Sequence, residues 1–473
     1  MSLTLEPYPK YSDSGIAWLG QMPDHWKRCR IKNIFRESDR RSMTGEGLLL
    51  SLTRLRGLIP QSTATAKLPS AADLGKYKVC MPGELVMNRM QAWSGMFAIA
   101  QCEGLVSPDY SVFNKIPNLN VEYFEYLFKS PIYVQQFAAN SKGVGSGFNR
   151  LYTPDFTAIP VCIPPFEEQT DIAIFIRRFS VKFARLIRAK RRVIELLNEQ
   201  KRAIIHDLIT QGVGSASLIQ PVDNEWFPKI PAGWSLVTLR RVIKQAIDGP
   251  HFSPKYVDSG VPFISARNIR IDRWSLDDAK FVTEEDYEEF SKRVVPLPGD
   301  VLYTKGGTTG VARVVDLPFR FQVWVHVAVL KIRTDRAIPE YLALALNSPK
   351  CYEQSQLFTR GATNQDLGLN RMKNIILPLP PDLKGQRDIV EQANRRIGPV
   401  NAATHDAEQE IALLREYRTR LIADVVTGKL DVRRVQLPEI DPDELESLAE
   451  VEEDAPDSET ELVGAQEADD ASN

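Results

Sequence analysis

The sequence predicts an α+β fold: two pseudo-repeated α/β domains are separated by two long helices that form an antiparallel coiled coil, and a disordered acidic C-terminal tail follows. Three observations predict it. Short motifs occur twice in the same order, two long stretches carry a helical apolar pattern, and the last 38 residues contain no basic residue. With 473 residues the chain is long enough for two or three domains that each bury a core.

Duplicated motifs are the strongest sign of two similar domains. Residues 18–26 and 226–234 share two tryptophans and a proline at a constant offset of 208. Pro82-Gly83 and Pro298-Gly299 each precede an acidic residue and an apolar run, which predicts a turn at the entrance to a β-strand. Because the motifs recur in one order, we expect the two halves to share one architecture.

The later part of each half predicts short helices and a terminating strand. Apolar residues in 122–127 and in its counterpart have helical spacing, and Ser130-Pro131 and Ser348-Pro349 should supply the N-cap and first-turn proline of the next helix. Each half closes with apolar residues interleaved with prolines, at 159–165 and 375–381. Because proline cannot donate a ladder hydrogen bond, these segments predict edge strands or strand ends.

A long amphipathic helix is expected after each half. Apolar residues recur at spacings of three, four or seven from Ile172 to Leu208 and from Ile389 to Val425, and the two patterns align without gaps at an offset of 217. A helix of about 40 residues is roughly 60 Å long. We expect the two apolar seams to pair with each other as an antiparallel coiled coil, with one domain near each end.

The composition excludes several classes of protein. No apolar run is long enough for a transmembrane helix, and the first ten residues lack a signal-peptide pattern. The five cysteines are widely spaced, odd in number and without a CxxC motif. This spacing argues against a disulfide scaffold or a cysteine-rich zinc module and fits a reducing cytoplasm.

Acidic residues are concentrated at the C-terminus. Residues 436–473 contain 15 Asp or Glu and no Lys, Arg or aromatic residue, which is typical of a disordered extension. Without them the formal net charge of −2 becomes +13 on residues 1–435. A basic body suggests a polyanionic ligand, and two basic domains held apart by a stiff spacer suit two half-sites on duplex DNA.

Loops in which Arg, Lys, Asn and Gln sit among small residues are the candidates for base contact. Arg and Lys match the major-groove edge of guanine, and Asn and Gln match that of adenine. Trp93 lies in such a loop and is a candidate for contact with a base or sugar. The candidate DNA-binding residues are Arg54, Arg56, Asn88, Arg89, Gln91, Trp93, Lys142, Asn149 and Arg150 in the first half, and Arg267, Asn268, Lys305, Thr308, Arg360, Asn364 and Gln365 in the second.

The motifs together resemble the specificity subunit of type I restriction–modification enzymes. The resemblance is carried by the opening residues 8–26, by the run 164–169 (Pro-Pro-Phe-Glu-Glu-Gln) before the first long helix, and by the run 427–431 (Thr-Gly-Lys-Leu-Asp) after the second. It covers residues 1–432 and leaves the acidic tail outside. In one place the sequence departs from it, because the second proline segment, 380–386, lacks the Glu-Gln pair. We interpret this departure as drift in a helix start.

The resemblance implies that each variable domain is a target recognition domain that reads one part of a bipartite DNA target. The long helices would space the two domains and dock modification subunits, two of them, which carry S-adenosylmethionine and methylate adenine. With restriction subunits, which use ATP and Mg, the assembly would cleave unmodified double-stranded DNA as a host defence. This chain would bind no cofactor and no metal itself, and would lie in the cytoplasm of a bacterium or archaeon, away from membranes.

The resemblance also implies a linear division of the chain. The expected segments are an N-terminal segment (1–26), target recognition domain 1 (27–165), a central long helix (166–212), target recognition domain 2 (213–381), a C-terminal long helix (382–432) and the acidic tail (433–473).

The residues themselves indicate no chemistry in this chain. Residues 306–310 are glycine-rich but lack the lysine of a phosphate-binding loop. The run 164–166 is similar to the catalytic loop of adenine methyltransferases, but Ile163 precedes it and cannot supply the required amide. Two other hypotheses remain open at this stage: a coiled-coil scaffold that does not bind DNA, and a self-contained methyltransferase with a fused recognition domain.

Overall fold

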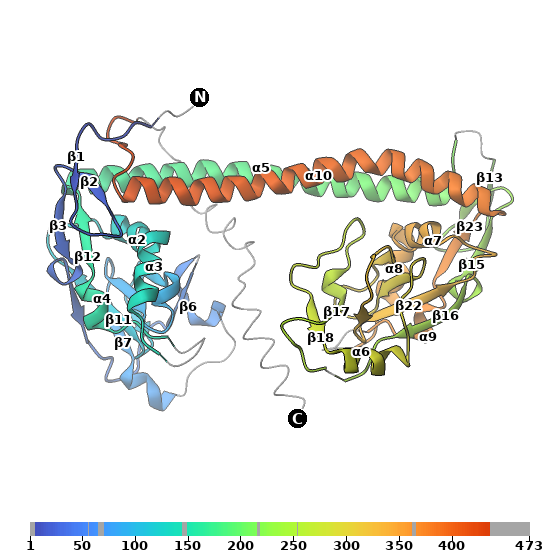
Figure 1. The fold of residues 1–473 in the computed structure, drawn as a ribbon, viewed down its shortest axis with the longest axis horizontal. Helices are drawn as coiled ribbons and strands as arrows, with labels where there is room; N and C mark the ends of the chain where they lie inside the picture. Colours follow the sequence, from blue (N-terminus) through green and yellow to red (C-terminus); the bar gives the residue numbers. More distant parts are fainter. Residues whose placement is uncertain are drawn as a thin grey trace. The chain divides into compact units, whose positions relative to one another are not determined.

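The computed structural model describes residues 5–54, 56–64, 71–143, 149–214, 218–252, 254–361 and 366–435. It forms two compact units (Figure 1). The first unit combines the residues up to Arg191 with those from Gln409 on, and the second is Arg192–Glu408. Each unit therefore contains one globular domain and one half of each long helix, so the units cut across the linear division of the sequence.

A four-stranded antiparallel sheet lies at the centre of each domain, and its strand order is the same in both. In the first unit the order is β4 (Phe35–Ser38), β11 (Tyr110–Lys115), β8 (Leu85–Asn88) and β9 (Phe97–Ile99). In the second it is β16 (Ile243–Asp248), β22 (Val327–Ile332), β19 (Val301–Thr304) and β20 (Ala312–Val314). Both Pro-Gly turns precede the third strand of this order, β8 and β19, as the sequence predicts.

Two helices follow the second strand of each sheet. They are α2 (Val121–Lys129) and α3 (Pro131–Asn140) in the first unit, and α7 (Pro339–Leu346) and α8 (Pro349–Phe358) in the second. The serine before each proline has the extended backbone of an N-cap, but its side chain caps no helix. The Ser130 hydroxyl instead donates to the Leu127 carbonyl at 2.6 Å. The predicted N-cap serine and first-turn proline are nevertheless confirmed in both helices.

Each proline-rich segment forms an edge strand, as expected. β12 (Pro160–Ile163) pairs only with β3 (Lys27–Arg30), and β23 (Ile376–Leu379) pairs only with β15 (Ser235–Thr238). A short helix precedes each of them, α4 (Thr153–Ala158) and α9 (Leu369–Met372).

The remaining elements extend these domains. Those of the first unit are β1 (Tyr11–Asp13) paired with β2 (Gln21–Pro23), β5 (Leu50–Thr53) paired with β6 (Gly57–Pro60), α1 (Gln61–Ala64), and β7 (Lys78–Cys80) paired with β10 (Gly104–Val106). Those of the second are β13 (Ile219–Pro221) paired with β14 (Lys229–Pro231), α6 (Glu284–Ser291), and β17 (Val261–Ile264) between β18 (Lys280–Val282) and β21 (Gln322–Val323).

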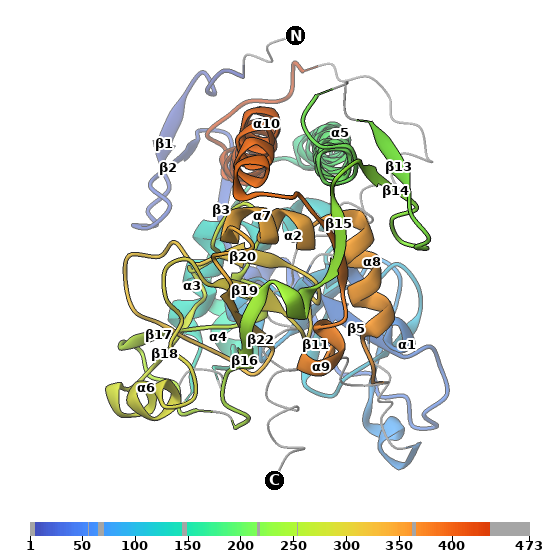
Figure 2. The same ribbon diagram turned by 90° about the vertical axis from the view of Figure 1, so that its right-hand side faces the viewer.

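The long helices are α5 (Phe166–Gln211) and α10 (Leu383–Val426), and they run antiparallel in contact with each other (Figures 1 and 2). In the first unit Phe183 of α5 stacks on Tyr417 of α10, with ring centroids 5.8 Å apart, and Lys190 forms an ion pair with Glu410. From the first contact to the second, the residue number rises along α5 and falls along α10, so the two helices run antiparallel. The predicted helices and their pairing are thus confirmed.

Each domain buries its core against its own half of the helix pair. Ile172 and Val425 lie in the core of the first unit, and their counterparts at offset 217, Ile389 and Leu208, lie in that of the second. The first core is aromatic: the ring centroids of Phe97 and Phe137 lie 5.0 Å apart.

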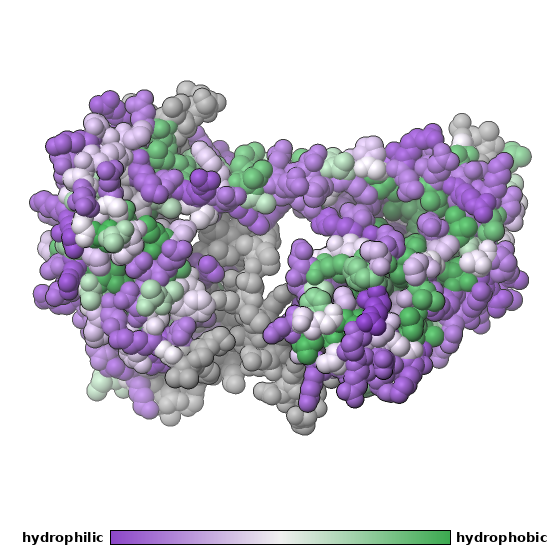
Figure 3. Space-filling model, in the orientation of Figure 1, coloured by the Kyte–Doolittle hydropathy of each residue, from purple (hydrophilic) through white to green (hydrophobic). Residues whose placement is uncertain are grey.

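Hydrophilic residues dominate the visible surface of each unit (Figure 3). None of the helices that the structure describes has an apolar stretch that could cross a bilayer.

Candidate nucleic-acid interface

Three loops meet at the C-terminal end of β8 in the first unit, and we call this meeting point the first junction. They are the loop after β8 (residues 89–96), the loop before β11 (107–109) and the segment around Lys142 and Arg150. The Leu151 amide donates to the Arg89 carbonyl at 2.9 Å, and Lys142 and Arg150 exchange two backbone hydrogen bonds of 2.9 Å. Backbone bonds therefore hold together loops that are far apart in sequence.

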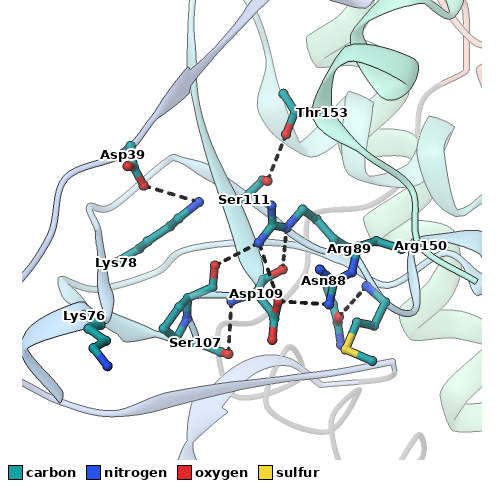
Figure 4. A network of polar contacts seen from close by, with 12 residues as sticks. Asp39, Lys76, Lys78, Asn88, Arg89, Ser107, Asp109, Ser111, Arg150 and Thr153 are labelled. Atoms are coloured by element: carbon teal, nitrogen blue, oxygen red, sulfur yellow. Dashed lines mark hydrogen bonds and ion pairs between the residues drawn. The ribbon is translucent and has the colours of Figure 1, made fainter. Parts of the chain in front are cut away.

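Two arginines of the first junction converge on Asp109 (Figure 4). Arg89 donates from Nε to the Asp109 carbonyl at 2.8 Å and from Nη2 to the Pro108 carbonyl at 3.0 Å. Arg150 Nη2 lies 3.1 Å from Asp109 Oδ1. Both guanidinium groups thus bind the loop before β11, which limits the donors that they can offer to DNA.

The other candidates after β8 stabilise a turn. Asn88 Nδ2 donates to Gln91 Oε1 at 2.9 Å, and Asn88 Oδ1 accepts from the Met90 amide at 3.1 Å. Trp93 Nε1 donates to the Met90 carbonyl at 2.9 Å. Asn88 is buried, whereas the Gln91 and Trp93 side chains are half-buried. The turn is therefore built from the same amides that the sequence suggested for reading adenine.

The second unit contains the corresponding second junction after β19. The Lys305 amide donates to the His326 carbonyl, and the Leu367 amide donates to the Lys305 carbonyl, both at 2.8 Å. Arg360 and Asp366 exchange two backbone hydrogen bonds of 3.0 and 2.8 Å. Lys305 and Leu367 lie 216 residues after Arg89 and Leu151, so the two junctions are equivalent.

Lys305 is the buried centre of an ionic cluster in the second junction. Only 4% of the residue is exposed, and its Nζ lies 2.7 Å from Asp366 Oδ1 and 3.4 Å from Asp248 Oδ2. Arg293 donates from Nε to the Asp248 carbonyl at 2.8 Å and pairs with the Asp248 carboxylate. Burial of Asp248 favours its neutral form, but the Arg293 hydrogen bond and the charges of Lys305 and Arg293 outweigh burial and lower its pKa.

His326 packs tightly against this cluster. A Cβ added to Gly306 would lie 2.1 Å from His326 Nδ1, so only glycine fits there. His326 Nδ1 is buried without a hydrogen-bond partner, and the ring lies edge-on to Trp324 with centroids 5.0 Å apart. Burial, and secondly the charge of Lys305, lower the pKa of His326.

The equivalent junctions carry charges in a different arrangement. The cation Arg150 of the first corresponds to the anion Asp366 of the second, and Asp109 corresponds to His326. Sequence reasoning singled out the basic members and missed Asp109, Asp248 and Asp366. A signal was present, since Ser107-Pro108-Asp109 is a turn sequence, and β11 begins directly after it.

Among the remaining candidates, burial separates two groups. Asn268 is 3% exposed and bonded on both sides of its amide, to Ser265, Ser275 and Asp278. Asn149 is half-buried. The exposed candidates are Arg54, Arg56, Lys142, Arg267, Thr308 and Arg360. Asn364 and Gln365 lie outside the described residues.

The exposed candidates do not all gather at the junctions. Lys142 belongs to the first junction, where its Nζ binds Asp155 at 2.8 Å, and Arg360 belongs to the second. Arg54 instead lines a cavity beside α2, α5 and α10. No cluster of three or more metal-ligating side chains occurs in the ranges that the structure describes.

Two similar domains that each present polar loops at one end of a sheet define a duplicated recognition module. A family model of the type I restriction modification DNA specificity domain matches residues 85–196 and 231–395. These ranges cover more than half of the chain, which therefore belongs to this family. It is a DNA sequence-specificity subunit, the non-catalytic recognition component of a type I restriction–modification system.

Similar proteins agree with this assignment. The chain is 22% identical over 316 residues to the type I restriction enzyme MjaVIII specificity subunit of Methanocaldococcus jannaschii, an alignment that covers 66% of this chain and 71% of that one. It is 21% identical over 333 residues to the MjaIX specificity subunit of the same organism, with 68% and 72% covered. A solved structure on complex assembly and conformational transition of the type I R-M system has the same fold, with a TM-score of 0.58, 17% identity, and 86% of this chain and 99% of that chain covered.

Proposed function

We propose that each domain reads one part of a bipartite double-stranded DNA target through its exposed polar loops, which include the loops of its own junction. The observation that carries this proposal is the repetition of one sheet order with a three-loop junction at the same strand end. Different side chains on equivalent loops would give each domain its own sequence preference. The net charge of +13 on residues 1–435 supports attraction to DNA phosphates.

The candidate residues divide into two roles within this proposal. Asn88, Arg89, Arg150, Asn268 and Lys305 position the loops, because their polar groups are bonded inside the domain. Exposed Arg267, Thr308 and Arg360 contact DNA, and Lys142, whose Nζ is bonded to Asp155, contacts it only when that ion pair opens. This division follows from hydrogen-bonding capacity, since a donor already bonded to protein must break that bond before it can bind a base edge.

The long helices provide the surface for the partners. They carry large apolar side chains that are exposed in the chain alone, among them Leu196 on α5 and Leu413 on α10, which are 48% and 64% exposed. Such residues favour contact with another protein. We assign this surface to two modification subunits, which would carry S-adenosylmethionine, with restriction subunits supplying ATP- and Mg-dependent cleavage.

Selection of binding sites from a pool of random duplexes tests the proposal. The full chain, alone and with modification subunits, should enrich two short conserved elements separated by a spacer of fixed length. Arg267→Ala should relax the sequence at positions in one element only and leave the other intact. Enrichment of a single element, or loss of preference in both elements on changing Arg267, would contradict one part per domain.

A further inference from the structure

Each unit contains a polar cavity at an equivalent place. The first pocket, in the first unit, has a volume of about 780 Å³ and lies among α2, α5, α10 and the end of β9. The second pocket, of about 330 Å³, lies among α7, α5, α10 and β20. Arg418 lines the first pocket and Lys201, its counterpart at offset 217, lines the second. The two repeats therefore contain cavities at equivalent positions.

The two pockets differ in charge. Five basic residues line the first pocket, Arg54, Lys115, Lys129, Arg177 and Arg418, together with the acids Glu122 and Glu125. In the second pocket, two basic residues face three acids, Asp272, Asp316 and Glu340. Lys129 and Arg177 of the first pocket correspond to the neutral Asn347 and Asn394 of the second. The excess of cations is thus particular to the first pocket and does not follow from the shared fold.

The acids of the first pocket leave a surplus of three positive charges. Glu125 is paired with Lys129 at 2.6 Å, whereas Arg177 Nη1 lies 3.8 Å from Glu122. Burial raises the pKa of Glu122, and the Arg177 charge offsets only part of this effect. Arg54 and Lys115 are exposed, and Lys115 Nζ donates to the Leu119 carbonyl at 2.9 Å. The first pocket is therefore suited to a ligand with several negative charges.

The chain itself supplies such a ligand close by. α10 lines the first pocket with Arg418, Thr419 and Ile422 and ends at Val426. The chain then continues to Val435, which packs against the core of the same unit, and Arg433 lies 5.0 Å from the Tyr8 ring. Residues 436–473, which we call the acidic segment, follow directly and carry 15 carboxylates. A chain of 38 residues can span at most about 125 Å, so the length of the acidic segment does not prevent it from reaching a pocket of the same unit.

We propose that the acidic segment of this chain binds the first pocket through Arg54, Lys115, Lys129 and Arg177. Its carboxylates neutralise cations that otherwise attract polyanions without regard to sequence. The inference is independent of which bases the domains read, because Arg54, Lys115, Lys129 and Arg177 belong to neither junction, although Ser94 and Gly95 of the first junction also line the pocket.

Zero-length carbodiimide cross-linking of the full chain, which joins a lysine amine to a carboxylate in contact, tests this assignment. Mass spectrometry should find acidic-segment carboxylates joined to Lys115 and Lys129 more often than to Lys142. Lys142 is the stringent reference, since its side chain is 67% exposed in the same unit against 28% for Lys129. These links should decrease as salt rises from about 0.05 M to about 0.5 M, because salt screens exposed charges.

Variants of the full chain separate the pocket from general charge attraction. Arg54→Gln with Arg177→Gln should lower the links to Lys115 and Lys129 by about threefold or more, whereas Arg267→Gln with Arg360→Gln in the second unit removes the same charge and should leave them unchanged. The proposal would be overturned if the acidic segment were joined to Lys115 and Lys129 no more often than to Lys142. It would also be overturned if these links were equally frequent in the two double variants. Weaker binding of random duplex by the first variant with its links unchanged would overturn it as well, since the pocket would then belong to nucleic acid.

Discussion

At the scale of single residues, burial decides whether a polar side chain positions a loop or faces the solvent. Arg267 and Asn268 are neighbours in one turn, yet Arg267 is exposed while Asn268 is 3% exposed and bonded to three residues. Arg89 and Lys305 likewise bind loops of their own domains. Residue type alone therefore does not separate the side chains that hold a loop from those that face the solvent.

The neighbouring pair gives the most direct test of this division. Asn268→Ala should lower the free energy of unfolding by about 1–3 kcal/mol, because it leaves buried partners unsatisfied. Arg267→Ala should change stability by less than about 0.5 kcal/mol and weaken DNA binding by about tenfold. Urea unfolding and DNA titration measure the two effects. The assignment of Asn268 to loop positioning and Arg267 to DNA contact would be contradicted if Arg267→Ala lowered the free energy of unfolding more than Asn268→Ala does.

We expect His326 to make the stability of the second unit dependent on pH. Its pKa in the folded chain is lowered from the usual 6.5, chiefly by burial, so the unfolded chain binds a proton more readily. Stability should therefore be full above about pH 6.5 and decrease as the pH falls below that value. Hydrogen exchange in residues 301–332, measured at about pH 7.5 and pH 5.5 and corrected for intrinsic rates, reports the change. His326→Gln should remove most of this pH dependence; an equal dependence in the variant would show that another group causes it.

At the scale of elements, the start of each long helix is held by a glutamine. Gln169 accepts from the Asn120 amide and donates to the Pro164 carbonyl. Gln386 accepts from the Ile338 amide, the counterpart of Asn120, but donates to the Arg336 carbonyl. The residue before it differs, because Gly385 stands where the first copy has Glu168. The departure that the sequence suggested as drift is thus the loss of the contacts of one residue, Glu168, while the glutamine still accepts from the equivalent backbone amide.

Glu168 fixes the N-terminal segment to α5. It is 4% exposed and accepts from Tyr8 Oη at 2.6 Å and Trp26 Nε1 at 3.0 Å, with His25 Nε2 at 2.6 Å. Burial and the Glu168 hydrogen bond raise the pKa of Tyr8, so its phenol stays a donor.

Glu168→Ala should loosen this attachment and speed hydrogen exchange in residues 5–26 by about tenfold or more, since hydrogen bonds to a charged group contribute about 1.5–3 kcal/mol each. Glu167→Ala is the matched control, because Glu167 is the exposed neighbour on the same turn. Equal exchange in the two variants would rule out the attachment.

The sequence predicted elements better than contacts. The Pro-Gly turns, the edge strands and both long helices follow from local rules on proline, glycine and apolar spacing, and the structure confirms them. The ionic partners of Arg89 and Lys305 lie 20 and 61 residues away, at Asp109 and Asp366. No periodic pattern encodes such pairs, because they depend on which loops the sheet brings together.

At the scale of the whole molecule, two unbroken helices link two copies of one domain. α5 and α10 each contribute apolar residues to both cores at a constant offset. Pro399 lies inside α10 without ending the helix. In the proposed function this linkage sets the length of the DNA spacer.

Lengthening both helices by one heptad tests the spacer role. Seven residues inserted after Arg191 in α5 and after Glu408 in α10 keep the apolar seam and add about 10 Å. The selected DNA spacer should grow by about three base pairs, at 3.4 Å each. Four residues inserted in α5 alone break the seam and should abolish selection. An unchanged spacer in the heptad variant would refute the role of the helices as a ruler.

Exchange of one domain tests the central claim most directly. Residues 35–158 can be replaced by those of a relative without disturbing the β3–β12 pair, which holds both ends of the exchanged segment. Binding-site selection with the exchanged chain should return one new element, with the other element and the spacer kept as in the original chain. A change in both elements would contradict the account, because it would mean that the two repeats do not read DNA independently.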